Sequence, residues 1–524
     1  MTVRNWAVTL AARDASGTTV YRRYAQRAAE SGGYFHEARV QQPGLIRESL
    51  FGPGRTRGPL EIGAGVVVLL NADGALDELR DLNFDGQFFT AQDVGTPALG
   101  GIYYTQGILE QAVFDENTVT LQVRDYRHRY DVELLTARYT GVDLSPFYAP
   151  GAWADVTDDI AMSPRPALYG IARNFEPVLV DDVRLIYQVD GQRGFLTGWS
   201  LDVYDARSAL TQGADYADEA AILATAPAAG EFRVWPAGGV FRLGSSPTGI
   251  VTCDAENPPM ASPYNASTVV NILRALAFGS SGHAYVYVDN DPAAGIYLRE
   301  QISRLEAINR VVQSISAFFS YRTQPQTETL GNRPWVGQLS PPDSPYYTPS
   351  RDPALLDRSV ILPGSLRQMV PGEEQRGLPV WRVNVRYRRN YRVMSATDLA
   401  GVALADQLFC SQEWRTASYE DAAVLGQFPD ALELTVDSLI DLQADAEAEA
   451  ERLFGLFGTR RRVFTCTVPT IAAVNQYADM NGLNVGRQVT LQYPRFGLDA
   501  GVTMIILSAE LDAADDRVNL QVWG

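Results

Sequence analysis

Two stretches far apart in the chain repeat one strand pattern, ENTVTLQVRD at 116–125 and DDRVNLQVWG at 515–524. Apolar residues occupy every second position in both copies: Val119, Leu121 and Val123 in the first, and Val518, Leu520 and Val522 in the second. Successive side chains of a strand point to opposite faces of a sheet. Each stretch therefore predicts a β-strand with one apolar face and one polar face.

A second match lies upstream in the same order, GQFFTAQ at 86–92 and GRQVTLQ at 486–492. The offset between the copies is 400 residues here and 399 in the later match. Each copy also has an acidic pair just before its last strand, Asp115-Glu116 and Asp515-Asp516. Two matches in one order and nearly one register indicate an internal duplication of a β domain. Chance similarity between strands of like composition is the alternative.

Size and composition predict a globular protein of about three or four domains. The chain has 524 residues, of which 46% are hydrophobic and 20% charged. Its formal net charge is −18, and none of its 44 basic residues is a lysine. Such a surface does not favour gripping nucleic acid, which needs clustered positive charge. The absence of lysine is explained either by GC-rich coding or by a use of arginine in bidentate interface pairs.

The three cysteines, Cys253, Cys410 and Cys466, are scattered and follow no metal-ligand spacing. They predict neither a disulfide framework nor a zinc site, and they fit a reducing compartment. No apolar run approaches the roughly 18 residues that a membrane helix needs, so we expect a soluble protein without membrane insertion. The short run WAVTLAA at 6–12 fits a strand better than a signal sequence.

The overall pattern predicts a mainly β protein with a few helices (α+β), and four regions can be separated. We expect a first β domain at 1–165, a peripheral β/α domain at 166–322, a linker or arm at 323–379 and a second β domain at 380–524. Ten prolines fall between 323 and 379, which predicts extended connecting chain rather than regular elements. Helices are predicted at 298–321 and 441–458 from their apolar periodicity and charge order.

A duplicated β domain has a geometric use. Three subunits with two copies each present six similar modules around an axis, so they can continue a sixfold ring while staying threefold elsewhere. Closing the ring also removes free sheet edges.

Longer stretches of the sequence resemble tail proteins of bacteriophages and of phage-like gene transfer agents, and in particular the tail hub or baseplate hub. The stretches are PALYGIARNFEPVLVDDVRLIYQVD (166–190), GVFRLGSSPTGIVTCD (239–254) and the last 39 residues, 486–524. The resemblance implies a homotrimer in which two tube-type β-barrel domains per chain form a pseudo-hexameric ring. It implies a place at the tail tip of the virion, after assembly in the host cytoplasm. The implied partners are further copies of the chain, the distal tail or tube ring protein, a tip or fibre protein and a tape measure protein.

DNA is then expected to pass through the ring without sequence-specific binding, since an acidic lumen does not attract phosphates. We expect the polar strand faces to line the channel, although they fit the solvent face of a half-buried sheet equally well. The residues concerned are Thr90, Gln92, Thr120, Gln122, Thr490, Gln492, Asn519 and Gln521. The Gly- and Pro-rich stretch LFGPGRTRG at 50–58 predicts a hairpin tip from which Arg55 and Arg57 reach a neighbouring subunit or ring.

Enzyme chemistry finds little support in the sequence, so no catalytic, metal or cofactor residues are predicted. His36, His128 and His283 stand alone, without HExxH or neighbouring cysteines. The adjacent carboxylates of Asp181 and Asp182 point to opposite faces of a strand, and the EAEAE run at 447–451 fits a solvated helix face. The alternative function is a tail-associated protein that degrades or binds cell wall or glycan, to which the Tyr-rich DSPYYTPSRDP at 343–353 is the best lead.

Overall fold

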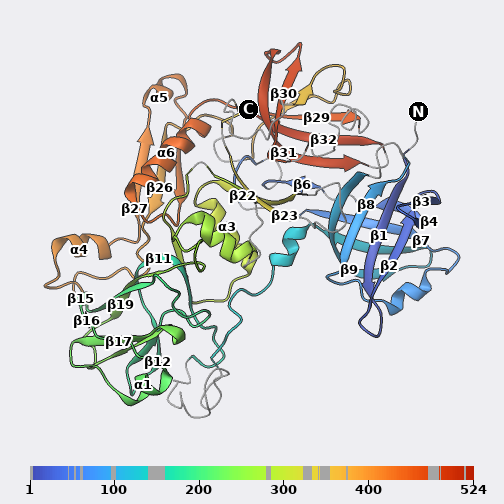
Figure 1. Cartoon of the computed structure of the whole chain (residues 1–524). Coiled ribbons are helices and arrows are strands. Elements are labelled where there is room, and N and C mark those ends of the chain that lie inside the picture. Colours follow the sequence, from blue (N-terminus) through green and yellow to red (C-terminus); the bar gives the residue numbers. More distant parts are fainter. Residues whose placement is uncertain are drawn as a thin grey trace.

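The computed structural model of the chain confirms a mainly β protein with a few helices (Figure 1). It describes residues 4–44, 47–51, 55–58, 63–95, 102–139, 160–278, 285–288, 290–322, 333–339, 341–342, 354–372, 376–469, 483, 485–512 and 515–524. Two large curved sheets lie side by side, one built from the start of the chain and one mainly from its end, and the remaining sheets lie beyond the second (Figure 1).

The first large sheet, here called the N-terminal module, has nine strands in the order β3-β4-β2-β1-β8-β9-β10-β7-β5. The strands are β1 (Trp6–Arg13), β2 (Thr19–Ala25), β3 (Ala29–Ser31), β4 (Tyr34–Ala38), β5 (Val40–Pro43), β7 (Ala64–Leu70), β8 (Phe88–Asp93), β9 (Ile102–Phe114) and β10 (Thr118–Arg124). The sheet curls round one apolar cluster that includes Leu10, Phe89 and Leu121. The predicted apolar face of β10 is confirmed, because Val119, Leu121 and Val123 are all fully buried.

The second large sheet, here called the C-terminal module, has the order β24-β30-β31-β32-β29-β25. Its strands are β24 (Ala354–Leu356), β25 (Arg367–Met369), β29 (Val463–Pro469), β30 (Gln488–Tyr493), β31 (Leu498–Asp512) and β32 (Arg517–Trp523). A seventh strand, β6 (Glu48–Ser49), comes from the N-terminal module and pairs with β31.

Two five-stranded sheets between residues 167 and 298 make up the part of the chain here called the middle region. One sheet has the order β15-β14-β19-β11-β21 and the other β12-β13-β18-β17-β16. The strands are β11 (Ala167–Phe175), β12 (Val178–Asp181), β13 (Ile186–Gln188), β14 (Ser200–Asp205), β15 (Ser208–Ala209), β16 (Thr211–Gln212), β17 (Glu231–Trp235), β18 (Val240–Leu243), β19 (Val251–Asn257) and β21 (Gly295–Leu298). Phe175, Phe232 and Phe241 pack between them.

Short helices and two three-stranded sheets fill the space between the middle region and the C-terminal module (Figure 1). The strands are β20 (Tyr285–Tyr287), β22 (Ala317–Arg322), β23 (Arg333–Gln338), β26 (Arg382–Tyr387), β27 (Arg415–Glu420) and β28 (Glu433–Asp437). The α-helices among the described residues are α1 (Glu219–Ala224), α2 (Val269–Leu273), α3 (Arg304–Gln313), α4 (Leu404–Cys410), α5 (Ala423–Gln427) and α6 (Gln443–Phe457). Helix α6 packs on β26 and β27, and its Arg452 donates to the carbonyl of Leu339, next to β23.

Three features differ from the sequence prediction. Strands β23, β24 and β25 fall inside 323–379, where only connecting chain was expected, and β24 and β25 complete the C-terminal module. Residues 382–457 form their own sheet and helices, inserted between β25 and β29, instead of belonging to the second β domain. The helix predicted at 298–321 ends at Gln313, because Ser316 has a left-handed φ of 44° and β22 begins at Ala317.

Candidate functional site

The two modules share one strand order and one chain order. From β8 onward the N-terminal module runs β8-β9-β10-β7-β5, and the C-terminal module runs β30-β31-β32-β29-β25 in the same way. The three consecutive strands β8, β9 and β10 form a meander, and β30, β31 and β32 form its counterpart. In both modules the other two strands come earlier in the chain, β5 and β7 in the first and β25 and β29 in the second. The duplication that the sequence predicts is thus present as a repeated topology.

The pairing register is repeated residue by residue on one side of the last strand. Val119 of β10 pairs with Leu69 of β7. At the same offset of 399 residues, Val518 of β32 pairs with Val468 of β29. Two strands that are similar by chance need not share a pairing register. A shift of one residue would move every side chain to the other face of the sheet. The repeated register therefore favours duplication over coincidence.

The same holds on the other side of the last strand. Leu121 pairs with Ala112 of β9, and Leu520 pairs with Ala509 of β31. In both hairpins the register then shifts by one residue within the next two positions, which marks a β-bulge. Bulges re-aim side chains at defined places and are kept as designed features. The two modules carry theirs at matching places.

The turn into the meander is also repeated. Gly86 and Gly486 both adopt left-handed φ angles, 70° and 80°. The amide of Gly86 donates to the carbonyl of Leu109 at 3.0 Å, and that of Gly486 donates to the carbonyl of Ile506 at 2.7 Å. Glycine suits this turn because a Cβ would strain the left-handed backbone. The modules differ at the far strand, since β1 runs antiparallel to β8 whereas β24 runs parallel to β30.

The modules are joined by a strand that crosses from one to the other. Strand β6 leaves the N-terminal module after β5 and pairs with β31, with Ser49 opposite Ser508 and Glu48 opposite Ala509. The amide of Leu50 donates to the carbonyl of Leu507 at 2.9 Å. Beyond the end of β30, this part of β31 would otherwise show an open edge. A short strand of the same chain covers it.

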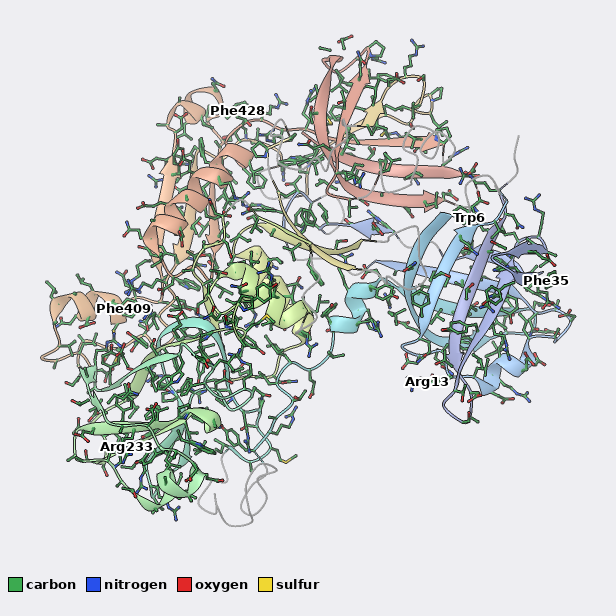
Figure 2. All side chains as sticks on the ribbon, in the orientation of Figure 1. Trp6, Arg13, Phe35, Arg233, Phe409 and Phe428 are labelled. Atoms are coloured by element: carbon green, nitrogen blue, oxygen red, sulfur yellow. The ribbon has the colours of Figure 1, made fainter. Side chains whose placement is uncertain are left out.

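A second contact joins the start of the N-terminal module to the last turn of the C-terminal module. Arg4 Nε lies 2.6 Å from Asp516 Oδ1, and Arg4 Nη1 lies 3.6 Å from Asp93 Oδ2 at the end of β8. Trp6 follows at the end of the N-terminal module that faces the C-terminal strands (Figure 2). The acidic turn noted in the sequence therefore has an intramolecular partner.

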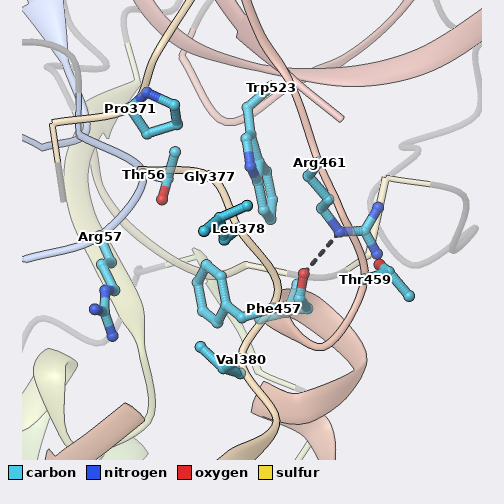
Figure 3. A pocket seen from close by; sticks show the side chains of 11 residues that line it. Thr56, Arg57, Pro371, Gly377, Leu378, Val380, Phe457, Thr459, Arg461 and Trp523 are labelled. Atoms are coloured by element: carbon cyan, nitrogen blue, oxygen red, sulfur yellow. Dashed lines mark hydrogen bonds between the residues drawn. The ribbon is translucent and has the colours of Figure 1, made fainter. Parts of the chain in front are cut away.

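The Gly-Pro stretch predicted to reach a neighbour reaches the C-terminal half of its own chain. Arg57 lies over the ring of Phe457 at 5.7 Å. Together with Thr56 it lines a small cavity beside Trp523 (Figure 3). Arg461 closes the other side, where its Nε donates to the carbonyl of Leu456 at 2.7 Å. Arg55 is exposed, so its predicted contact with another subunit or ring stays a prediction.

The predicted channel residues divide into two groups. Thr90, Gln92 and Gln521 are buried within the single chain and offer little surface. The others are exposed or half-buried: Thr120, Gln122, Thr490, Gln492 and Asn519. A lining role for them stays a prediction, and the surface that a channel can use comes from this second group.

The polar faces of the strands carry an ion pair in the N-terminal module and a neutral hydrogen bond in the C-terminal module. Arg124 Nε lies 2.8 Å from Glu110 Oε1 across β10 and β9. Thr467 Oγ1 and Asn519 Oδ1 form a hydrogen bond of 2.9 Å across β29 and β32. These faces therefore combine neutral polar groups with a locally compensated ion pair.

The described residues contain no cluster of three or more His, Cys, Asp or Glu side chains placed to hold a metal ion. His36 is buried, and this burial lowers the pKa of its imidazole. His283 and the Tyr-rich stretch 343–353 lie outside the described residues. Within the part of the chain that is described, no helix has the length and hydrophobicity to cross a membrane.

The carboxylates considered for chemistry have structural partners. Asp181 Oδ2 lies 2.8 Å from Arg184 Nη1. In the EAEAE run, Glu449 is buried and its Oε1 lies 2.7 Å from Arg452 Nη2. The prediction of a solvated helix face is therefore wrong at this residue. Arg452 also donates to the carbonyls of Leu339 and Ile315, so this pair links α6 to neighbouring elements.

No family model matches the sequence, and no curated protein matches it either. Among solved structures, the chain is similar to phage tail proteins. A tail protein from Neisseria meningitidis MC58 is 10% identical with a TM-score of 0.42, covering 99% of this chain and 96% of that one. The 43 kDa tail protein of prophage MuSo2 from Shewanella oneidensis is 12% identical with a TM-score of 0.39, covering 94% and 97%. Prophage tail protein gp18 from Listeria monocytogenes EGD-e is 6% identical with a TM-score of 0.38, covering 99% and 94%.

These structures come from the same class of protein that the sequence resembles. Sequence reasoning found the repeated strands and the acidic turn. It missed the crossing strand β6, because two residues of an edge pairing leave no periodic pattern.

Proposed function

We propose that the chain is a non-enzymatic structural protein of a phage tail tip. Three copies form a ring of six similar β modules around a channel, and the ring adapts a sixfold tail tube or distal tail ring to a threefold tip. The observation that carries the proposal is the repeated module, with Leu121–Ala112 and Leu520–Ala509 in one register. Two modules per chain are what a threefold assembly needs to present six.

The contact between the modules supports a ring rather than independent beads. Strand β6 and the Arg4–Asp516 pair fix one module on the edge of the other through backbone pairing and an ion pair. A head-to-tail relation of this kind generates a ring when its rotation closes. The two modules within a chain then supply one step of that rotation.

The charge pattern supports passage of DNA through the ring without binding. The chain carries a net charge of −18 and no lysine, and on the polar face described above Arg124 is paired with Glu110. Phosphates are attracted by unpaired positive charge, so such a lumen lets DNA slide. Further partners on this proposal are the distal tail or tube ring protein, a tip or fibre protein and a tape measure protein.

The test is the mass and shape of the purified protein. Native mass measurement at micromolar concentration is expected to give three times the 57.5 kDa of one chain. Averaged electron micrographs are expected to show six similar lobes around one bore. A stable monomer at every concentration would overturn the proposal. A monomer that also degrades peptidoglycan or binds glycan would favour the alternative, a tail-associated protein acting on the cell wall.

A further inference from the structure

We propose that the free edge of β9, residues 111–114, is the docking site for the C-terminal module of a second copy of the chain. The inference rests on the proposed ring, and it names the surface through which one copy meets the next. It is argued from the features that join the two modules within a chain and from their counterparts on the N-terminal module.

The first feature is the edge that β6 covers. It lies on β31 at Ser508 and Ala509, just beyond the stretch of β31 that pairs with β30. The register of the two modules places β31 opposite β9 at an offset of 397 residues, so the counterparts are Gln111 and Ala112. These lie just beyond Ile108, the last residue of β9 that pairs with β8.

In the N-terminal module no described strand covers this edge. Residues Ala112 to Phe114 pair with β10 on one side, and on the other side no described strand pairs with them. Val113 is 64% exposed and Phe114 is 36% exposed. Leu511, the counterpart of Phe114, packs against the core of the C-terminal half. An open edge with exposed apolar side chains is a template for pairing with another chain.

The second feature is the turn that follows. In the C-terminal module the turn before β32 is held by Arg4 through Asp516. In the N-terminal module the corresponding turn, 115–117, is exposed. Asp115 is used within the turn, where it accepts from the amides of Asn117 and Thr118. The N-terminal module thus presents an open edge and an exposed turn side by side, with the uncharged Asn117 at the position of Asp516.

The occupant follows from the same correspondence. Within a chain, β31 is covered by residues that follow β5. The counterpart of β5 is β25, and the residues that end and follow it, Met369 and Val370, are 41% and 68% exposed. In the proposed ring, the C-terminal module that meets the free edge of β9 belongs to the next copy. The residues that cover this edge are therefore Met369 and Val370 of a second copy. Apolar side chains on both surfaces match in character.

The first experiment places a photo-reactive benzoylphenylalanine at Gln111 in the full chain. Irradiation is expected to join two copies, and mass mapping is expected to find the bond in the C-terminal module near Met369 and Val370. The same substitution at Val183, which is 72% exposed in the middle region, is the matched control and should give no such product.

The second experiment substitutes Val113→Asp, with Val183→Asp as control. The exposed position of Val113 predicts a folded monomer, checked by circular dichroism and urea unfolding, whose assembly is weakened by about tenfold or more. If trimers form but the cross-link maps elsewhere, and V113D assembles normally, the docking site is wrong while the ring survives. If the unmodified chain never assembles, the ring and the docking site fall together.

Discussion

Arg4 Nε lies 2.6 Å from Asp516 Oδ1, so the residue before the first strand is paired with the turn before the last one. The arginine side chain is 11% exposed and the aspartate 46%. We expect Asp516→Ala to lower the free energy of unfolding by about 0.5–1 kcal/mol at low ionic strength, and by less in high salt. Urea unfolding at two salt concentrations measures both.

The matched control is Asp81→Ala. Its partner Arg80 lies 3.6 Å away, and both side chains are at least 70% exposed, so solvent already screens the pair. We expect no salt-dependent change for this variant. Equal behaviour of D81A and D516A would show that the contact between the modules adds nothing to stability.

Gly86 and Gly486 occupy the same left-handed turn in the two modules. We expect Gly86→Ala and Gly486→Ala each to lower the free energy of unfolding by about 1–2 kcal/mol, because a Cβ is strained at these φ angles. Open space surrounds the Cβ that would be added at Gly86, so the cost there is conformational rather than steric. Chemical unfolding of the two variants side by side measures whether the modules respond alike.

Gly455→Ala is the control in the opposite direction. Gly455 lies inside α6, and outside the helix's own nearby backbone no atom lies within 4 Å of an added Cβ. Alanine is the better helix former, so this variant should gain about 0.5–1 kcal/mol. Loss of stability in G455A, or a gain in G86A, would contradict the assignment of these backbone conformations.

Much of the fold could be predicted because apolar and polar residues alternate clearly along the strands, and because the sequences of the repeated strands are similar. Thr90 and Thr490 lie at matched positions of β8 and β30, as the aligned text predicted. What the alternation could not predict is which polar residues stay exposed. Gln122 is exposed but Gln521 is buried, and Gln521 pairs with Ser508 of β31, whose other side is covered by β6.

Other predictions failed where tertiary contacts override local pattern. The apolar spacing of 298–321 fits a helix throughout, yet AFFSY at 317–321 joins a sheet once Ser316 turns the chain. Prolines predicted a connector at 323–379, although short edge strands such as β24 tolerate prolines around them. Neither the edge pairing of β6 nor the target of Arg57 leaves a signal in the sequence, since both depend on residues hundreds of positions away.

Glu48, in the crossing strand β6, predicts a pH dependence of stability. Burial raises the pKa of its carboxyl group from 4.5 to about 7 in the folded chain. Between these values the folded state holds a proton that the unfolded state has lost, so the free energy of unfolding falls as pH rises from about 4.5 to about 7. The full effect is on the order of 3 kcal/mol. Glu48→Gln should remove this part of the dependence.

Unfolding by urea at several pH values from 4.5 to 8 measures this effect. Glu116→Gln is the control, because its carboxylate is exposed in the turn before β10. Parallel pH profiles for E48Q and the unmodified chain would show that the carboxyl group of Glu48 is not desolvated at the contact between the modules.

The three cysteines report on the order in which parts of the chain open. Cys253, Cys410 and Cys466 are free and buried, and burial raises the pKa of all three thiols, that of Cys466 to about 12. Only the thiolate reacts with iodoacetamide, so the native protein is expected to stay unlabelled.

As urea is added, we expect Cys410 to be labelled first. It is the last residue of α4 and packs in a small cluster with Met394 and Leu399, whereas Cys253 and Cys466 lie in the large cores of the middle region and the C-terminal module. Regions with few buried apolar contacts open at lower free energy than the main cores. Mass spectrometry of digests after short labelling pulses below the main unfolding transition measures the order. Labelling of Cys466 ahead of Cys410 would mean that the C-terminal module opens before the inserted segment, and that its repeated sheet is not a stable unit of the chain.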